Sequence, residues 1–171
     1  TPLFLACQLG RVDVARFLIE RGADIEASLR GNGWTPLFVA AWAGQESVVS
    51  ALLSAGANAK AETTAEAHGI PAGSTPLSIA SREGHAEVAA ALLAAGADPN
   101  ATVMDGWTAL MASAENGHEP CVRLLLAKGA DIKAAGREGA PWKMPPPSAD
   151  PAAVHASIES RLDALRAAAA R

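Results

Sequence analysis

The sequence is poor in the residues that build a deep globular core. Only 4% of its 171 residues are aromatic, and it contains no tyrosine. Half of the residues are nevertheless hydrophobic, and much of that half is alanine. Because small side chains let backbones approach closely, this composition favours thin helical elements stacked in layers over a compact enzyme domain.

Charge and cysteine are also scarce, and each shortage excludes a class of protein. A charged fraction of 19% and a mean hydropathy of +0.14 are too apolar for a disordered chain. The net charge of −4 argues against nucleic-acid binding. No apolar run reaches the roughly 18 residues of a membrane span, so neither a membrane helix nor a secretory leader is expected. The two cysteines are too few for a disulfide framework, which predicts an intracellular, cytoplasmic protein. A nuclear protein, or one delivered into a host cell, stays an open alternative.

Three short motifs recur four times in a fixed order. Thr-Pro-Leu begins at Thr1, Thr35 and Thr75, and Thr108 begins a near copy. The spacings between successive threonines are 34, 40 and 33 residues. A glycine follows each threonine after about nine residues, and each copy ends in Gly-Ala-Asp or Gly-Ala-Asn. Such self-similarity at a fixed period indicates a stacked repeat architecture.

Each motif has a physical role in a helical hairpin. Threonine caps free backbone N–H groups, and proline suits the first helical position. A glycine ends that short helix because it adopts the left-handed conformation readily. A second helix, such as the one from Glu87 to Leu93, ends at the glycine of Gly-Ala-Asp. The predicted unit is therefore helix, turn, helix and protruding hairpin.

This unit resembles the ankyrin repeat family, whose consensus is close to residues 73–101, GSTPLSIASREGHAEVAAALLAAGADPNA. The resemblance implies an all-α ankyrin-repeat solenoid over about residues 1–134, with repeats at about 1–27, 28–60, 70–101 and 102–134. The second spacing leaves an insertion at about 61–72. The family's histidine after Thr-Pro-Leu is absent, and its four replacements are Phe4, Phe38, Ser78 and Met111.

Two further segments follow the predicted repeats. Residues 135–149 contain a partial fifth hairpin and a proline-rich spacer, and 150–171 read as a C-terminal helix with one apolar stripe. That helix is expected to cap the solenoid, with dimerisation as the alternative. At the other end, Phe4, Leu5 and Leu9 would face a missing neighbour, so we expect the repeat array to continue upstream.

No catalytic or metal-binding constellation is predicted, and no cofactor is expected. His85 and His118 follow the glycine between the helices, where the resemblance implies a structural histidine. No Cys or His pair has the spacing of zinc ligands. Cys7 and Cys121 fall at positions that the family fills with small core residues. The sequence also lacks a nucleophile elbow, a phosphate-binding loop and a dinucleotide fingerprint.

The resemblance instead implies a monomeric, non-catalytic scaffold that binds a protein partner through its concave face. The family's variable surface positions predict the candidate partner-binding residues, which are Asn32, Trp34, Trp42, Arg82, Glu83, Asp105, Trp107, Glu115 and Asn116. Tryptophan and arginine are enriched at interface hot spots. Trp42 is the sharpest candidate, because an indole on an open helix face needs an explanation; a core role is its alternative. Trp34 and Trp107 could instead brace their hairpins.

The sequence leaves several alternatives open. The insertion could bind a partner, since long loops on rigid scaffolds often carry function, or it could be a tolerated, mobile loop. The chain could also be the targeting module of a kinase, ubiquitin ligase or effector. A bare stability scaffold is a third possibility, although the irregular insertion argues against a designed consensus protein.

Overall fold

Pairs of short helices repeat four times along the chain in a computed structural model, which describes residues 1–28, 31–103 and 106–133. The helices are α1 (Pro2–Gln8), α2 (Val12–Glu20), α3 (Pro36–Trp42), α4 (Glu46–Ser54), α5 (Pro76–Glu83), α6 (Ala86–Ala94), α7 (Ala109–Glu115) and α8 (Glu119–Ala127). A two-stranded antiparallel ribbon of β1 (Thr102–Val103) and β2 (Trp107–Thr108) precedes α7. The predicted all-α solenoid is confirmed for this part of the chain. The proline-rich spacer and the predicted C-terminal helix lie outside the described residues.

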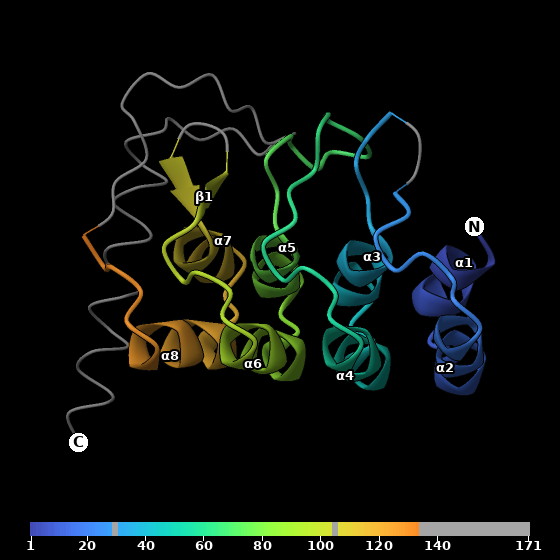
Figure 1. The fold of residues 1–171 in the computed structure, drawn as a ribbon. Helices are drawn as coiled ribbons and strands as arrows, with labels where there is room; N and C mark the ends of the chain where they lie inside the picture. Colours follow the sequence, from blue (N-terminus) through green and yellow to red (C-terminus); the bar gives the residue numbers. More distant parts are fainter. Residues whose placement is uncertain (29–30, 104–105, 134–171) are drawn as a thin grey trace.

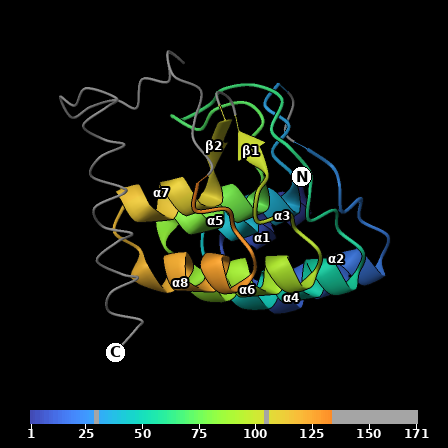
Figure 2. The ribbon, with the colours of Figure 1, turned by 90° about the vertical axis from the view of Figure 1, so that its left-hand side faces the viewer.

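The helices form two layers. The first helix of every pair, α1, α3, α5 and α7, lies in one layer, and α2, α4, α6 and α8 lie in the other (Figure 1). The loops between successive pairs rise above the layer of first helices, as the view turned by 90° also shows (Figure 2). This arrangement gives the molecule a loop-side face, which we define as the surface formed by those loops and the first helices.

Threonine caps start the first helices, as the motif predicts. The hydroxyl of each threonine accepts a hydrogen bond from the backbone N–H three residues later, in all four repeats. Thr75 has a full capping box, because the Ser78 hydroxyl also accepts from the Thr75 backbone N–H at 2.9 Å. A serine in the family's histidine position therefore still closes the helix start.

The glycine between the helices makes room for the next repeat. Gly44 and Gly84 adopt left-handed φ values of 69° and 83°. A Cβ on Gly44 would lie 2.7 Å from the His85 ring, and one on Gly84 would lie 2.6 Å from the His118 ring. The His85 Nε2 also lies 3.1 Å from the Trp42 carbonyl oxygen. These contacts between repeats support the structural role predicted for the two histidines.

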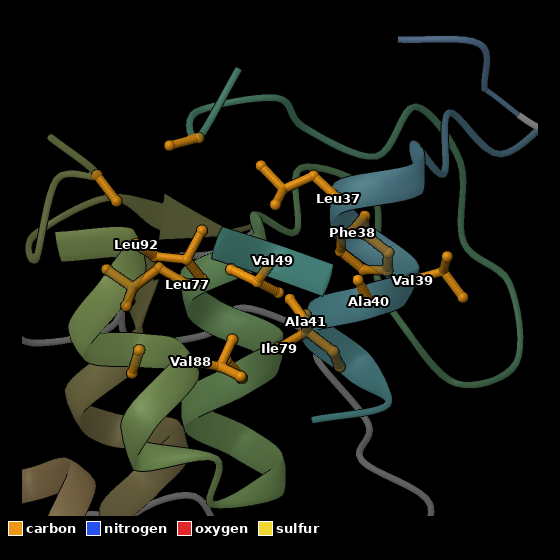
Figure 3. Packing of buried hydrophobic residues seen from close by; sticks show 14 of the residues in the cluster. Leu37, Phe38, Val39, Ala40, Ala41, Val49, Leu77, Ile79, Val88 and Leu92 are labelled. Carbon is orange, nitrogen blue, oxygen red and sulfur yellow. The ribbon is translucent and has the colours of Figure 1, made fainter. Parts of the chain in front are cut away.

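The core runs continuously between the two layers. Side chains from α3 to α6, such as Leu37, Val49, Leu77 and Leu92, pack together there (Figure 3). Alanine residues are fully buried among them, namely Ala40, Ala41, Ala80 and Ala89. The alanine content thus has the predicted consequence, because small residues at the contacts let adjacent helix pairs pack closely.

Candidate functional site

The insertion at 61–72 is folded against the repeats. Thr63 is buried, and its hydroxyl donates to the Pro71 carbonyl at 2.8 Å and accepts from the Ser74 N–H at 3.0 Å. Ile70 is 1% exposed, and Ala67 and Ile70 form an antiparallel bridge. The alternative of a merely tolerated, mobile loop does not explain this burial, since Ile70 belongs to the hydrophobic core.

The insertion also reaches back to the second repeat. It rises in green above α5 and bends toward the loop before α3 (Figure 1). The Thr64 N–H donates to the Asn32 carbonyl at 3.0 Å, and the His68 ring centroid lies 5.3 Å from that of Trp34. One loop therefore connects two repeats and covers part of the loop-side face.

This cover places Trp34 in the core. Its side chain is 3% exposed and packs between Phe38, at 5.6 Å between ring centroids, and Trp42, at 5.1 Å edge to face. The indole Nε1 has no hydrogen-bond partner in the described part of the chain. Trp34 therefore lies buried among α3 and the insertion, which fits the alternative that it braces its hairpin.

Trp42 and Asn32 also contribute mainly to the fold. Trp42 is partly buried and packs against the core, which fits its alternative core role; its place on a partner-binding surface stays a prediction. Asn32 is partly buried, and its Oδ1 accepts from the Trp34 N–H at 3.1 Å, which shapes the loop before α3. Asp105 lies outside the described residues.

Four other predicted residues come together at a cleft between repeats three and four. Arg82 from α5, Trp107 from β2, Glu115 from the end of α7 and the following Asn116 all line it. The rest of its wall consists of apolar residues and two serines, namely Ile70, Pro71, Ile79, Val103, Ala112, Ser74 and Ser78. Its volume of about 30 Å³ is open to solvent, which is room for about two waters.

The insertion orients the Arg82 side chain in this cleft. Its Nη1 donates to the Gly69 carbonyl at 3.1 Å, and its Nε lies 3.7 Å from Glu83 Oε1. Glu115 interacts electrostatically with the same guanidinium. Burial raises the pKa of the Glu115 carboxyl, and the charge of Arg82 partly lowers it again. The predicted residues Arg82, Glu83 and Glu115 therefore form one electrostatic group.

The polar groups inside the cleft are engaged within the protein. The Ser74 hydroxyl donates to the Pro71 carbonyl at 2.8 Å, and the Ser78 hydroxyl donates to the Thr75 carbonyl at 2.9 Å. At the rim, the exposed Asn116 donates through Nδ2 to the Ala112 carbonyl at 2.8 Å. The interior of the cleft is thus apolar in character, and its polar chemistry lies at the edge.

Sequence reasoning missed Ile70, Pro71 and Val103 as cleft residues. Ile70 and Pro71 lie in the insertion, which has no counterpart among the variable positions of a standard repeat. The composition of the insertion could have pointed to Ile70, because Ile70 is the only large aliphatic residue between 61 and 72. Val103 pairs with Trp107 across the β1–β2 ribbon, a pairing that only the fold reveals.

Metal-ligand clusters and reactive thiols were the two kinds of site to look for in the described residues. No three His, Cys, Asp or Glu side chains among them are placed to hold a metal ion. Cys7 and Cys121 are free and buried, and burial raises their thiol pKa values to about 12 and about 11. Such thiols are not nucleophilic near neutral pH. Both cysteines pack in the core, as predicted.

The family follows from this fold and from a direct comparison. A family model described as ankyrin repeats (3 copies) matches residues 1–63 and 61–135. The chain is thus a repeat solenoid, and it belongs to the ankyrin repeat family. No curated protein matches the sequence. Ankyrin repeats are generally protein–protein interaction modules and are typically non-catalytic. Within the described ranges, no helix is both long and apolar enough to cross a bilayer.

Proposed function

We propose that this protein is a non-catalytic recognition module that binds a protein partner through the cleft between repeats three and four. The observation behind the proposal is the convergence of Arg82, Trp107, Glu115 and Asn116 at one apolar cleft on the loop-side face. We take this face to be the concave face that the family resemblance implies. An apolar centre with a polar rim is the usual anatomy of a protein interface.

The cleft is suited to binding without rearrangement. Arg82 is held by the Gly69 carbonyl and by Glu83. Trp107 lies in β2 and directly precedes Thr108, the residue that caps α7. Side chains already held in place lose little rotamer entropy when a partner binds. Arginine and tryptophan in such positions are the types most often found at hot spots.

The test is affinity capture with this chain, identification of the captured partner by mass spectrometry, and titration with purified variants. Arg82→Ala and Trp107→Ala should each weaken binding by about 1–2 kcal/mol. Arg123→Ala is the matched control, because Arg123 is an exposed arginine on α8 in the other layer. Unchanged affinity in both cleft variants, with folding intact by circular dichroism, would overturn the proposal.

The proposal also includes a monomeric, cytoplasmic protein with the repeat boundaries predicted above. Its two buried free thiols are consistent with a reducing compartment. Sedimentation of the purified chain tests the monomer, and a mass that doubles with concentration would contradict it.

A further inference from the structure

We propose that Thr63, which does not line the cleft, is a positioning residue for it. Its buried hydroxyl fixes residues 69–71 of the insertion, and these residues hold Arg82 in the orientation that a partner meets. The inference rests on the proposed function and adds the group that prepares the site for binding. Three features of the insertion carry it, namely a closed base, a strained turn and a carbonyl that holds the guanidinium.

Thr63 closes the base of the insertion with four hydrogen bonds. Its backbone N–H donates to the Ser74 carbonyl at 2.9 Å, and its carbonyl accepts from the Gly73 N–H at 2.7 Å. Its hydroxyl donates to the Pro71 carbonyl at 2.8 Å and accepts from the Ser74 N–H at 3.0 Å. The Ser74 hydroxyl donates to the same Pro71 carbonyl. Because Thr63 is only 4% exposed, little water competes for these bonds, and two hydroxyls fix one carbonyl.

A strained turn precedes this fixed carbonyl. His68 and Gly69 have left-handed φ values of 54° and 72°, a conformation that is unfavourable for a residue with a side chain such as His68. Two backbone hydrogen bonds between Ala67 and Ile70 close the turn. Strained backbone of this kind persists only where the surrounding contacts determine it. The bonds at the base of the insertion are therefore needed to keep the turn in one place.

The turn provides the contact that orients Arg82. The Gly69 carbonyl accepts from Arg82 Nη1 at 3.1 Å, whereas Glu83 Oε1 lies 3.7 Å from Arg82 Nε. The Arg82 side chain is 28% exposed, so without the carbonyl it would sample more rotamers, and a partner would have to order it on binding. The contacts thus run from the Thr63 hydroxyl through Pro71 and Gly69 to the guanidinium.

The first experiment measures the order of the Arg82 side chain in the free protein. Nitrogen-15 relaxation of the Nε–H bond reports this order, and Arg82→Lys identifies the signal. The order parameter should exceed about 0.6 in wild type and fall below that value in Thr63→Val, which removes the hydroxyl and nearly keeps the shape. Thr63→Ser retains a hydroxyl and should give the wild-type value. Thr64→Val is the matched control, because Thr64 is the exposed neighbour.

A second variant keeps this experiment decisive if Thr63→Val does not fold. Ser74→Ala removes the other hydroxyl on the Pro71 carbonyl and leaves the backbone bonds of Thr63 in place. It should lower the order of Arg82 in the same direction. Circular dichroism of each variant shows whether the repeats are folded.

The second experiment measures affinity for the purified partner identified by capture. Thr63→Val should bind it about fivefold more weakly than wild type, and Thr63→Ser equally well. In an Arg82→Ala background, Thr63→Val should have little further effect, because both residues then belong to one chain of contacts.

Two results would overturn the positioning role of Thr63. One is unchanged Arg82 order in folded Thr63→Val, and the other is a binding loss that stays undiminished in the Arg82→Ala background. If Arg82→Ala and Trp107→Ala weaken binding while Thr63→Val does not, the proposed function stands and the positioning role is refuted. If none of the cleft variants weakens binding, the proposed site is removed, and the positioning role with it.

Discussion

Two tryptophans at the same position of different repeats behave differently in this protein. Trp34 and Trp107 each stand directly before the threonine that caps a first helix. Trp34 is 3% exposed and is covered by the insertion, whereas Trp107 is partly exposed and lines the cleft. Both indoles pack against the core, so the neighbouring loop, and not the position within a repeat, decides how much of each stays exposed.

The insertion accounts for this difference. Its His68 lies against Trp34 in repeat two, while its Ile70 and Gly69 face the third repeat and contact the cleft and Arg82. The longer loop closes the surface over repeat two and builds one wall of the cleft beside repeat four.

The largest expected effect separates the two tryptophans. Trp34→Ala should lower the free energy of unfolding by about 3–5 kcal/mol, because it removes a fully buried indole. Trp107→Ala should cost about 1 kcal/mol and mainly affect binding. Urea denaturation followed by circular dichroism measures both, and Trp34→Phe should lie between wild type and Trp34→Ala. Equal losses for the two alanine variants would contradict the comparison.

The next effect tests whether the insertion belongs to the core. Ile70→Ala should destabilise the protein by about 2–3 kcal/mol, since Ile70 is 1% exposed. Glu66→Ala, an exposed change in the same loop, should stay within about 0.5 kcal/mol of wild type. Thermal melts of both variants provide the measurement. A negligible loss of stability for Ile70→Ala would instead favour the alternative that the insertion is a tolerated loop.

A third pair extends the comparison to the second helices. Val14 in α2 and Val48 in α4 occupy the same repeat position, but Val14 is 50% exposed and Val48 is 1% exposed. Val48→Ala should cost about 2 kcal/mol and Val14→Ala less than about 0.5 kcal/mol. Chemical denaturation should resolve this difference, and a reversed order would refute the assignment of burial.

The buried thiols predict a smaller, pH-dependent effect. Their pKa values are raised from 9.0 to about 12 in Cys7 and about 11 in Cys121, so the folded chain keeps protons that the unfolded chain loses. Stability should be full below pH 9 and fall between pH 9 and about 11–12. At pH 10 the loss should be roughly 1 kcal/mol per thiol. Urea titrations at pH 8 and about pH 10 test this, and a Cys7→Ala, Cys121→Ala double variant should lose that part of the pH dependence.

The smallest effect concerns an ion pair far from the cleft. Arg123 and Glu119, one turn apart on α8, approach to 2.6 Å and are about half exposed. Because solvent screens such pairs, Arg123→Ala should cost only about 0.3–0.5 kcal/mol. The same substitution at Arg82 should reduce partner binding. The two variants therefore contrast an arginine in a surface ion pair with an arginine in the proposed site. A large stability loss for Arg123→Ala would contradict this view.

Local chemistry explains why much of the fold could be predicted from the sequence. Thr-Pro starts a helix and glycine ends it through bonds within a few residues, so the helix pairs follow from short motifs. Of the residues predicted by repeat position, Arg82, Trp107, Glu115 and Asn116 line one cleft. Trp34 and Trp42 pack with the core and do not line that cleft.

The sequence by itself determined the repeat, the caps and the identity of the residues that stack between helix pairs, because each depends on local bonds or on the repeat period. Only the tertiary structure decided which face stays open. That outcome depends on contacts between residues distant along the chain, such as Thr64 with Asn32 and Arg82 with Gly69. Neither pair lies at a fixed repeat spacing, since the insertion has no counterpart in the other repeats.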